Sequence, residues 1–255
     1  MPRAPRFQAP GALYHIMSRG TAKRSIFLNA GDRRLFLKIL ATVVRHYRWL
    51  CHAYCLQDNH YHLILETPLP NVSDGMRYLN GSYCQAFNRT YNRVGHLTQG
   101  RYTSRLIEEE QYLFTLIRYI ALNPVKDGFC SHPAEWQWSS YRPTAGLAGK
   151  PAFLTTERIL DLFSDDVSEA RERYIAYITE AVQETGSKGQ KNLDRRRLLS
   201  KILDKASNRD EAIMQAHSVY CFKLREIGDY LGLHESTVSK IVKRAADRST
   251  RHPHC

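Results

Sequence analysis

The sequence lacks several features that would place it in well-known classes of protein. Its longest apolar stretches, such as residues 39–44, fall far short of the ~20 residues that a membrane-spanning helix needs. No signal peptide with an apolar core is visible at the N-terminus. The six cysteines form no C-x-x-C pair, so they read as reduced thiols rather than zinc ligands. We therefore expect a cytoplasmic, nucleoid-associated protein that makes no membrane contact.

Acidic residues are also in the minority, with 25 Asp and Glu against 37 Lys and Arg and a net charge of +12. The excess is uneven along the 255 residues. Residues 155–190 carry 4 basic and 8 acidic side chains, whereas residues 1–154 carry 19 and 9, and residues 191–255 carry 14 and 8. Two basic blocks separated by an acidic connector predict two surfaces for a polyanion. Charge alone does not distinguish DNA from RNA or the ribosome.

Hydrophobic residues make up 43% of the chain, enough for a packed core. Strand patterns cover residues 13–19, 49–56, 61–66 and 101–108, and helical patterns cover residues 32–47, 73–92 and 112–122. Asp32 and Ser73 are the expected N-caps, and Pro124 should end the third helix because proline cannot continue it. The order β-α-β-β-α-β-α predicts an α+β fold, a ferredoxin-like split βαβ sheet over residues 1–130.

The rest of the chain divides into two further parts. Residues 131–190 should form a wrapping segment and an acidic helical connector, with a flexible linker at residues 185–190. Residues 191–255 look all-helical. Within them, residues 224–244 fit a helix-turn-helix, with Gly228 where the two helices cross closely and Gly232 in the turn. The apolar positions where these helices meet are Ile227, Leu231, Val238 and Ile241.

The second of these two helices has a polar and basic side. We expect it to enter the major groove of duplex DNA, with contacts from Ser236, Thr237, Ser239, Lys240 and Lys243. Over about 30 residues the segment resembles the DNA-binding domain of the bacterial chromosomal replication initiator. The alternative is a helical hairpin that only packs on the first domain.

Two short motifs offer chemistry. His60 and His62 share one face of a strand, while Tyr61 points to the other, and two neutral imidazoles can hold a divalent cation. Tyr119 and Asn123 lie four residues apart, so on a helix they present a phenol and an amide to the same place. Taken singly, each motif is explained better by a structural role: two strand histidines, one buried and one exposed, and a helix end with Tyr119 in the core and Asn123 as the C-cap.

Together these groups suit the cutting of DNA through a phosphotyrosine link. A phenol with a pKa near ~10 is a weak nucleophile at neutral pH. A metal ion beside it can polarise a phosphate and stabilise the charge of the transition state. The covalent phosphotyrosine keeps the energy of the broken bond, so rejoining needs no ATP.

Residues 58–65 resemble the histidine-hydrophobic-histidine motif of single-tyrosine HUH transposases, and residues 118–126 resemble their nucleophile helix. Residues 14–20 and 138–142 are similar to the REP-associated tyrosine transposase branch, and the likeness covers roughly residues 10–145. It implies that Tyr119 is the nucleophile and that His60, His62 and Asn123 bind Mg²⁺ or Mn²⁺. Insertion-sequence members often have glutamine at the position of Asn123. Tyr61 is a poor second candidate for the nucleophile.

The resemblance implies DNA transposition by cleavage of single-stranded hairpin DNA. The expected backbone contacts are Arg19, Lys23, Arg24, Arg101 and Arg105, which could equally form a solvated basic rim. One alternative is a non-catalytic DNA-binding regulator derived from a transposase. Another is a replication-initiation or relaxase nuclease, although the chain has no G-x-x-x-x-G-K-[ST] loop for an appended helicase. Both a monomer and a homodimer are compatible with the sequence.

Overall fold

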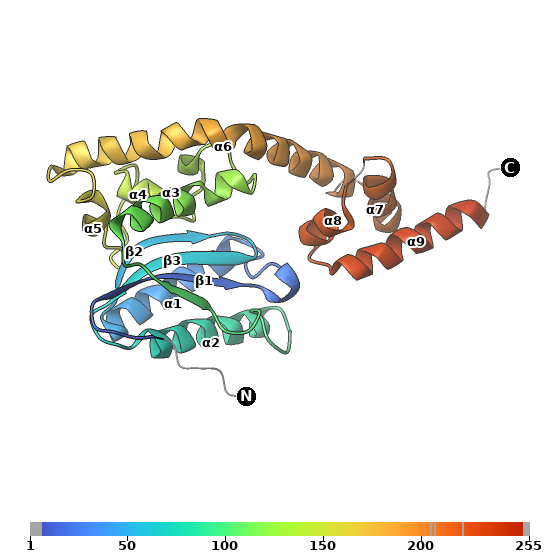
Figure 1. Cartoon of the computed structure of the whole chain (residues 1–255). Helices are drawn as coiled ribbons and strands as arrows, with labels where there is room; N and C mark the ends of the chain where they lie inside the picture. Colours follow the sequence, from blue (N-terminus) through green and yellow to red (C-terminus); the bar gives the residue numbers. More distant parts are fainter. Residues whose placement is uncertain (1–6, 205, 207, 221, 252–255) are drawn as a thin grey trace.

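The computed structural model describes residues 7–204, 206, 208–220 and 222–251. Its first part alternates strands and helices in the predicted order, and the α+β class is confirmed (Figure 1). The elements are β1 (Ala12–Arg19), α1 (Ala30–Tyr47), β2 (Leu50–Leu56), β3 (His60–Thr67), α2 (Val72–Thr90), β4 (Thr103–Leu106) and α3 (Glu110–Lys126).

The four strands form one antiparallel sheet in the order β2-β3-β1-β4. Alternate side chains of the strands face two different helical layers. Ile16, Tyr61 and Leu63 join the core beneath α1 and α2, whereas Leu13 and Ile64 join the core beneath α3. The sheet is therefore buried on both faces, with α1 and α2 on one side and α3 on the other.

Both predicted N-caps are wrong by a few residues. The side chain of Asn29 caps α1 by accepting from the backbone N–H groups of Gly31 and Asp32. The carboxylate of Asp32 closes a reciprocal capping box by accepting from the N–H of Asn29. Helix α2 begins after Asn71, whose side-chain oxygen accepts from Trp49 Nε1 instead, and Ser73 lies in the first turn.

Helix α3 does not end at Asn123 and Pro124 as predicted, but continues to Lys126. Proline removes one backbone donor, yet the next turn still forms, with the N–H of Asp127 donating to the carbonyl of Asn123 at 3.0 Å. Asn123, Pro124 and Val125 are all buried, so packing against the sheet outweighs the local cost of proline. Asn123 consequently lies inside a rigid helix rather than at its frayed end.

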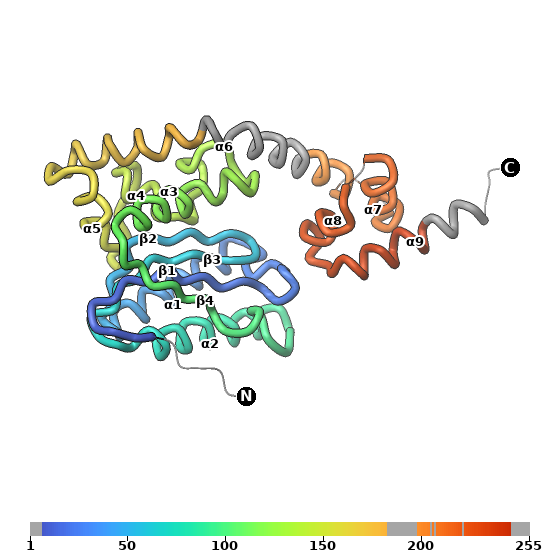
Figure 2. Tube along the Cα trace, in the orientation of Figure 1, coloured from blue at the N-terminus to red at the C-terminus, as the bar shows by residue number. Residues whose placement is uncertain are grey.

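The segment after α3 runs along the outer edge of β2. The carbonyl of Trp138 accepts from the N–H of Leu56, the N–H of Ser140 donates to the carbonyl of Tyr54, and Leu154 forms a bridge with Cys51. These bonds cover an edge strand that would otherwise be open to pairing. The segment contains the short helices η2 (Pro133–Glu135), α4 (Tyr141–Thr144) and α5 (Glu157–Leu160). Most of the chain between α3 and α6 lies on the α3 side of the sheet (Figure 2), while Phe153 and Leu154 reach the α1–α2 core at the edge of β2.

The flexible linker predicted at residues 185–190 is wrong, because α6 (Val167–Asp204) runs through it without a break. The two glycines of that stretch cost a helix about 1 kcal/mol each, but the lysine and glutamine residues around them favour it. The first half of α6 packs on α3 through Ala170, Tyr174 and Ile178.

The predicted helices after residue 204 are α7 (Arg209–Ser218), α8 (Leu224–Leu231) and α9 (Glu235–Arg251). Ile227 and Val238 are fully buried where α8 meets α9. Gly232 turns the chain with a φ of +67°, a conformation that favours glycine. A Cβ on Gly228 would lie 2.6 Å from the carbonyl oxygen of Leu233, so the close crossing requires glycine there. Among the described residues, no helix combines the length and the apolar character needed to span a bilayer.

Helix α2 offers a matched test of this packing. A Cβ on Gly75 would lie 2.1 Å from the indole of Trp49, which is buried and tied to Asn71, whereas a Cβ on Gly81 would meet open space. We expect Gly75→Ala to lower the free energy of unfolding by about 1–3 kcal/mol through overpacking. Gly81→Ala should raise it by about 0.5–1 kcal/mol through helix propensity. Chemical denaturation of both variants checks this, and equal stability of the two would contradict the packing of α2 on Trp49.

Candidate active site

Two elements bring the predicted catalytic residues together at one end of the sheet. His60 and His62 lie at the beginning of β3 and face α3, which carries Tyr119 and Asn123. His62 is 1% exposed, Asn123 3% and His60 8%, whereas Tyr119 is 39% exposed. Three polar side chains are thus fixed inside the protein, and the phenol alone is open to a large substrate.

Asn123 links helix α3 to strand β3 within the site. Its Nδ2 donates to Nε2 of His62 at 3.3 Å, and its side chain also interacts with His60. The rings of His60 and His62 are nearly perpendicular, with centroids 5.0 Å apart. The ring of Tyr119 meets that of His62 edge-on at 5.3 Å. The structure therefore gathers the other three residues around His62.

The tautomer of each histidine follows from its other partner. Nδ1 of His60 donates to Oδ1 of Asn59 at 2.7 Å, and Asn59 is itself held by the carbonyl of Lys23 at 3.1 Å. Because an amide nitrogen can only donate, Nε2 of His62 accepts from Asn123, and its Nδ1 carries the proton. Both rings thus direct an Nε2 lone pair toward the same place beside Asn123. The role of Asn59 was not predicted from the sequence.

His15 is a member of the site that the motifs did not identify. Nδ1 of His62 donates to its Nε2 at 2.9 Å, and the two rings stack with centroids 5.2 Å apart. His15 lies on β1, where it is paired with Ile64 and is one strand away from His62. The alternation of residues 13–19 places its side chain on the correct face. Only the register between β1 and β3, which the sequence does not reveal, brings it to His62.

Burial keeps these imidazoles neutral. Desolvation and the charge of Arg19 together lower the pKa of His60 to about 4. The hydrogen bond between His60 and Asn123 acts in the opposite direction but is outweighed. Desolvation and the nearby Arg105 lower the pKa of His15 to about 4. The pKa of His62 is lowered well below its usual value, chiefly by burial. At neutral pH the site therefore offers lone pairs rather than positive charge.

The other tyrosine of the motif is placed as strand alternation predicts. Tyr61 is 1% exposed on the opposite face of the sheet, where its hydroxyl donates to Asn80 at 2.7 Å. Burial raises its pKa. It could reach a substrate only by leaving the core. Tyr119, in contrast, has a cation nearby, since Nζ of Lys126 lies 5.6 Å from its ring centroid.

The five expected DNA contacts are not gathered in one patch. Arg19 pairs with His60 in the sheet register, and Arg105 pairs with His15, so these two flank the histidines. Lys23 touches the site only through its backbone carbonyl, and Arg24 is exposed in the same loop. Arg101 lies apart, in a hollow between α2 and the residues before β4.

The donor set suits a divalent metal bound by nitrogen and oxygen. Within the described ranges, no three His, Cys, Asp or Glu side chains are arranged to hold a metal ion. The third donor would be the amide of Asn123, which would coordinate through its oxygen with the amide turned over. Two neutral imidazoles and one amide oxygen fit such an ion, and most of its coordination positions would remain open to phosphate and water.

Residues 9–123 match the family described as "Transposase IS200 like". The match covers a little under half of the chain, and this part holds all four site residues. A Haemophilus influenzae protein assigned to the REP-associated tyrosine transposases is 28% identical over 107 residues. That alignment covers 38% of this chain and 61% of the relative, so the chain spans about three fifths of the relative's length. The expected resemblance to REP-associated tyrosine transposases is confirmed.

A solved structure of a REP-associated tyrosine transposase bound to a REP hairpin has the same fold, with a TM-score of 0.50. It is 18% identical to this chain, and the superposition covers 61% of this chain and 92% of that one. The family match ends at Asn123, so the second half of the chain, including α6 to α9, lies beyond the matched residues.

The contact between His15 and His62 can be tested by its effect on stability. Replacing His15 with leucine leaves the buried Nδ1–H of His62 without an acceptor, which should lower the free energy of unfolding by about 1–3 kcal/mol. The double variant His15→Leu/His62→Leu removes both partners and should be destabilised by less than the sum of the single variants. Urea denaturation of the four proteins gives the coupling energy. Additive effects would show that the two rings are not hydrogen-bonded.

Proposed function

We propose that this protein cuts and rejoins single-stranded DNA through a covalent bond between Tyr119 and a 5′-phosphate. One observation carries the proposal: the only exposed member of the site is a phenol, and it lies against buried, neutral imidazoles. A substrate strand can reach Tyr119 without any rearrangement of the groups behind it. The match of residues 9–123 to IS200-like transposases supports the same reaction class.

His60, His62 and Asn123 would hold Mg²⁺ or Mn²⁺. Bound there, the ion would supply Lewis-acid polarisation of the scissile phosphate. The chain contributes the geometry. Asn59 and His15 orient the two imidazoles, and the interior of α3 fixes Asn123. Hydrogen bonds of this kind, from residues behind the ligands, keep the ligands oriented before the substrate arrives.

In the proposed reaction, Oη of Tyr119 attacks the phosphorus and loses its proton. The bond from phosphorus to the 3′ oxygen breaks, and that oxygen takes up a proton and leaves as a 3′-hydroxyl. The 5′-phosphate stays on the tyrosine, and attack by a 3′-hydroxyl reverses the step. The positive charges of Lys126 and Arg19 lie close enough to favour the approach of the phosphate.

For the substrate we propose hairpin DNA with a single-stranded flank, bound on a ferredoxin-like split βαβ sheet. The order β2-β3-β1-β4 with α1 and α2 on one face supports that description. The similar solved structure is, by its title, bound to a REP hairpin. Arg19 and Arg105 flank the histidines and would contact the strand near the cut. Lys23, Arg24 and Arg101 would contact it further away.

We further propose that α8 and α9 act as a helix-turn-helix on duplex DNA. The turn at Gly232 and the burial of Ile227 and Val238 give the pair of helices a fixed angle. The five predicted contacts are all exposed along α9, namely Ser236, Thr237, Ser239, Lys240 and Lys243. Hydroxyl and ammonium groups at the beginning of such a helix suit base edges and phosphates.

Substitution of Tyr119 by phenylalanine tests the reaction directly. A 3′-labelled hairpin oligonucleotide incubated with Mn²⁺ should give a labelled protein–DNA adduct with the wild type and none with Tyr119→Phe, because the attacking oxygen is gone. Tyr112→Phe, two turns earlier on the same helix, is the matched control and should keep the adduct. Denaturing gels with and without EDTA measure the product.

Two results would contradict the assignment. An adduct that survives in Tyr119→Phe would place the nucleophile elsewhere. Hairpin binding without cleavage by the wild type, with both metals and several hairpins, would favour a non-catalytic regulator with the same fold.

Metal binding can be measured without activity. His60→Ala and Asn123→Ala each remove one proposed metal donor. Losing a residue that only hydrogen-bonds to a ligand already lowers metal affinity by ~10–100-fold, so Mn²⁺ affinity should fall by at least that factor. His46→Ala removes an exposed histidine from the far side of the sheet, on α1, and should leave the affinity unchanged. Titration calorimetry gives the dissociation constants. Unchanged affinity in His60→Ala would rule out the proposed ligand set.

A further inference from the structure

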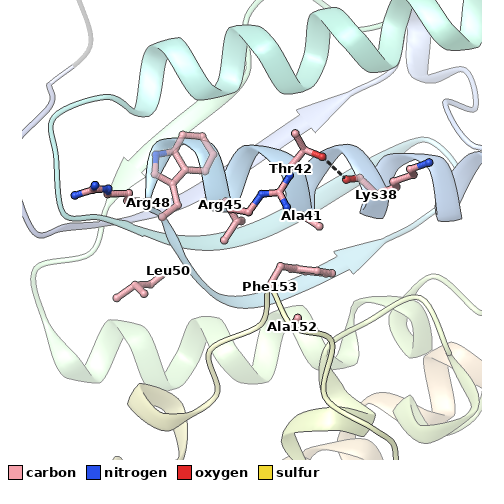
Figure 3. Close-up of a pocket in the computed structure, with 10 residues that line it drawn as sticks. Lys38, Ala41, Thr42, Arg45, Arg48, Leu50, Ala152 and Phe153 are labelled. Atoms are coloured by element: carbon pink, nitrogen blue, oxygen red, sulfur yellow. Dashed lines mark hydrogen bonds between the residues drawn. The ribbon is translucent and has the colours of Figure 1, made fainter.

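A hollow of about 640 Å³ lies on the side of the domain away from Tyr119, between α1, the beginning of β2 and residues 152–153 (Figure 3). Its size is that of small-molecule sites, which usually have ~300–1,000 Å³. The walls are polar and the floor is apolar. No step of the proposed cleavage reaction uses it.

The walls carry three cations from one helix and its end. Lys38, Arg45 and Arg48 are exposed, and Figure 3 shows them spread along α1. The described residues that line the hollow include no carboxylate. Within the part of the chain that the structure describes, none of the three makes an ion pair. Three cations along one concave surface give it a positive potential, which favours the binding of a phosphate group.

The floor of the hollow is apolar and suits a planar ring. Phe153 faces α1 from the segment along β2, and its ring is supported by Tyr54 at a centroid distance of 5.7 Å. Leu50 is 36% exposed at the edge of the hollow. Beneath them Trp49 is 2% exposed and fixed by its bond to Asn71, so the floor is rigid. A rigid aromatic surface beside cations is the usual platform for a nucleobase and its phosphate.

The hollow is distant from the cleavage site. Leu50 pairs with Glu66 at one end of β2 and β3, and Leu56 pairs with Tyr61 at the other, next to His60. Six residues of strand correspond to about 20 Å. Moreover, α1 covers the face of the sheet opposite to α3. One nucleotide cannot occupy the hollow and touch Tyr119 at the same time.

We propose that this hollow binds a nucleotide, with its phosphate at Arg45, the middle one of the three cations, and its base against Phe153 and Leu50. The nucleotide comes either from a DNA strand already held by the protein or from the free pool, and the chemistry of recognition is the same. The proposal does not depend on cleavage at Tyr119.

The test uses the full chain in a Tyr119→Phe background, so that failure of the cleavage reaction does not affect it. Titration calorimetry would compare dAMP, inorganic phosphate and the hairpin oligonucleotide with its single-stranded flank. We expect Phe153→Ala to weaken nucleotide binding roughly 5–150-fold, the usual effect of losing one stacking contact, and to leave inorganic phosphate unaffected. Arg45→Ala should weaken the binding of every probe that occupies the hollow. Arg34→Ala, on the same helix but outside the hollow, is the matched control.

The pattern across the probes distinguishes the sources. If dAMP binding depends on Phe153 and Arg45 while hairpin affinity does not, the site takes a free nucleotide. If hairpin affinity depends on both residues, the site takes a nucleotide of the DNA. If no probe depends on them, or if Phe153→Ala has no effect while Arg45→Ala weakens phosphate alone, the proposal is wrong. Phe153→Leu, which keeps the apolar volume and removes the ring, replaces Phe153→Ala where the alanine variant lowers the unfolding temperature.

Discussion

The antiparallel pairing of β1 with β3 is the constraint on which the candidate active site depends. Its register sets Arg19 opposite His60 and Met17 opposite His62, and it brings His15 within 2.9 Å of His62. Because strand side chains alternate, a slip of one residue would turn both histidines of β3 into the α1–α2 layer. The neighbouring residues Tyr61 and Leu63 oppose such a slip, since both are buried in that layer and would have to leave it.

The helical side of the site solves a different problem, which is to hold an amide firmly next to an accessible phenol. Burial of the residues around Pro124 extends α3 by a turn, so Asn123 gains the rigidity of a helix interior. Tyr119, one turn earlier, stays at the surface. Burial lowers the pKa values of His60 and His62, whereas the exposed side chain of Tyr119 remains accessible from the surface. A single helix thus serves both the buried and the open half of the site.

The sequence predicted what local patterns determine. Period-two and helical spacing gave the order of elements and placed His60, His62, Tyr119 and Asn123 on elements that meet. It failed where tertiary packing overrides local preference, as at Pro124, and where several caps competed, as at Asn29 and Asp32. The contact of His15 with His62 and the hollow beside Phe153 were not predictable, because both depend on which distant segments lie side by side.

The unbroken course of α6 changes how two DNA-binding surfaces would cooperate. A flexible linker would let the proposed helix-turn-helix sample many positions. Binding at one DNA site would then help binding at the other only by raising the effective concentration of the second site. A helix of 38 residues instead spans about 57 Å at 1.5 Å per residue. Its first half is packed on α3, the helix that carries Tyr119. A continuous helix would restrict where duplex DNA, proposed to bind at α9, can lie relative to the phenol, so the spacing of the two DNA sites would influence the choice of substrate together with their affinity.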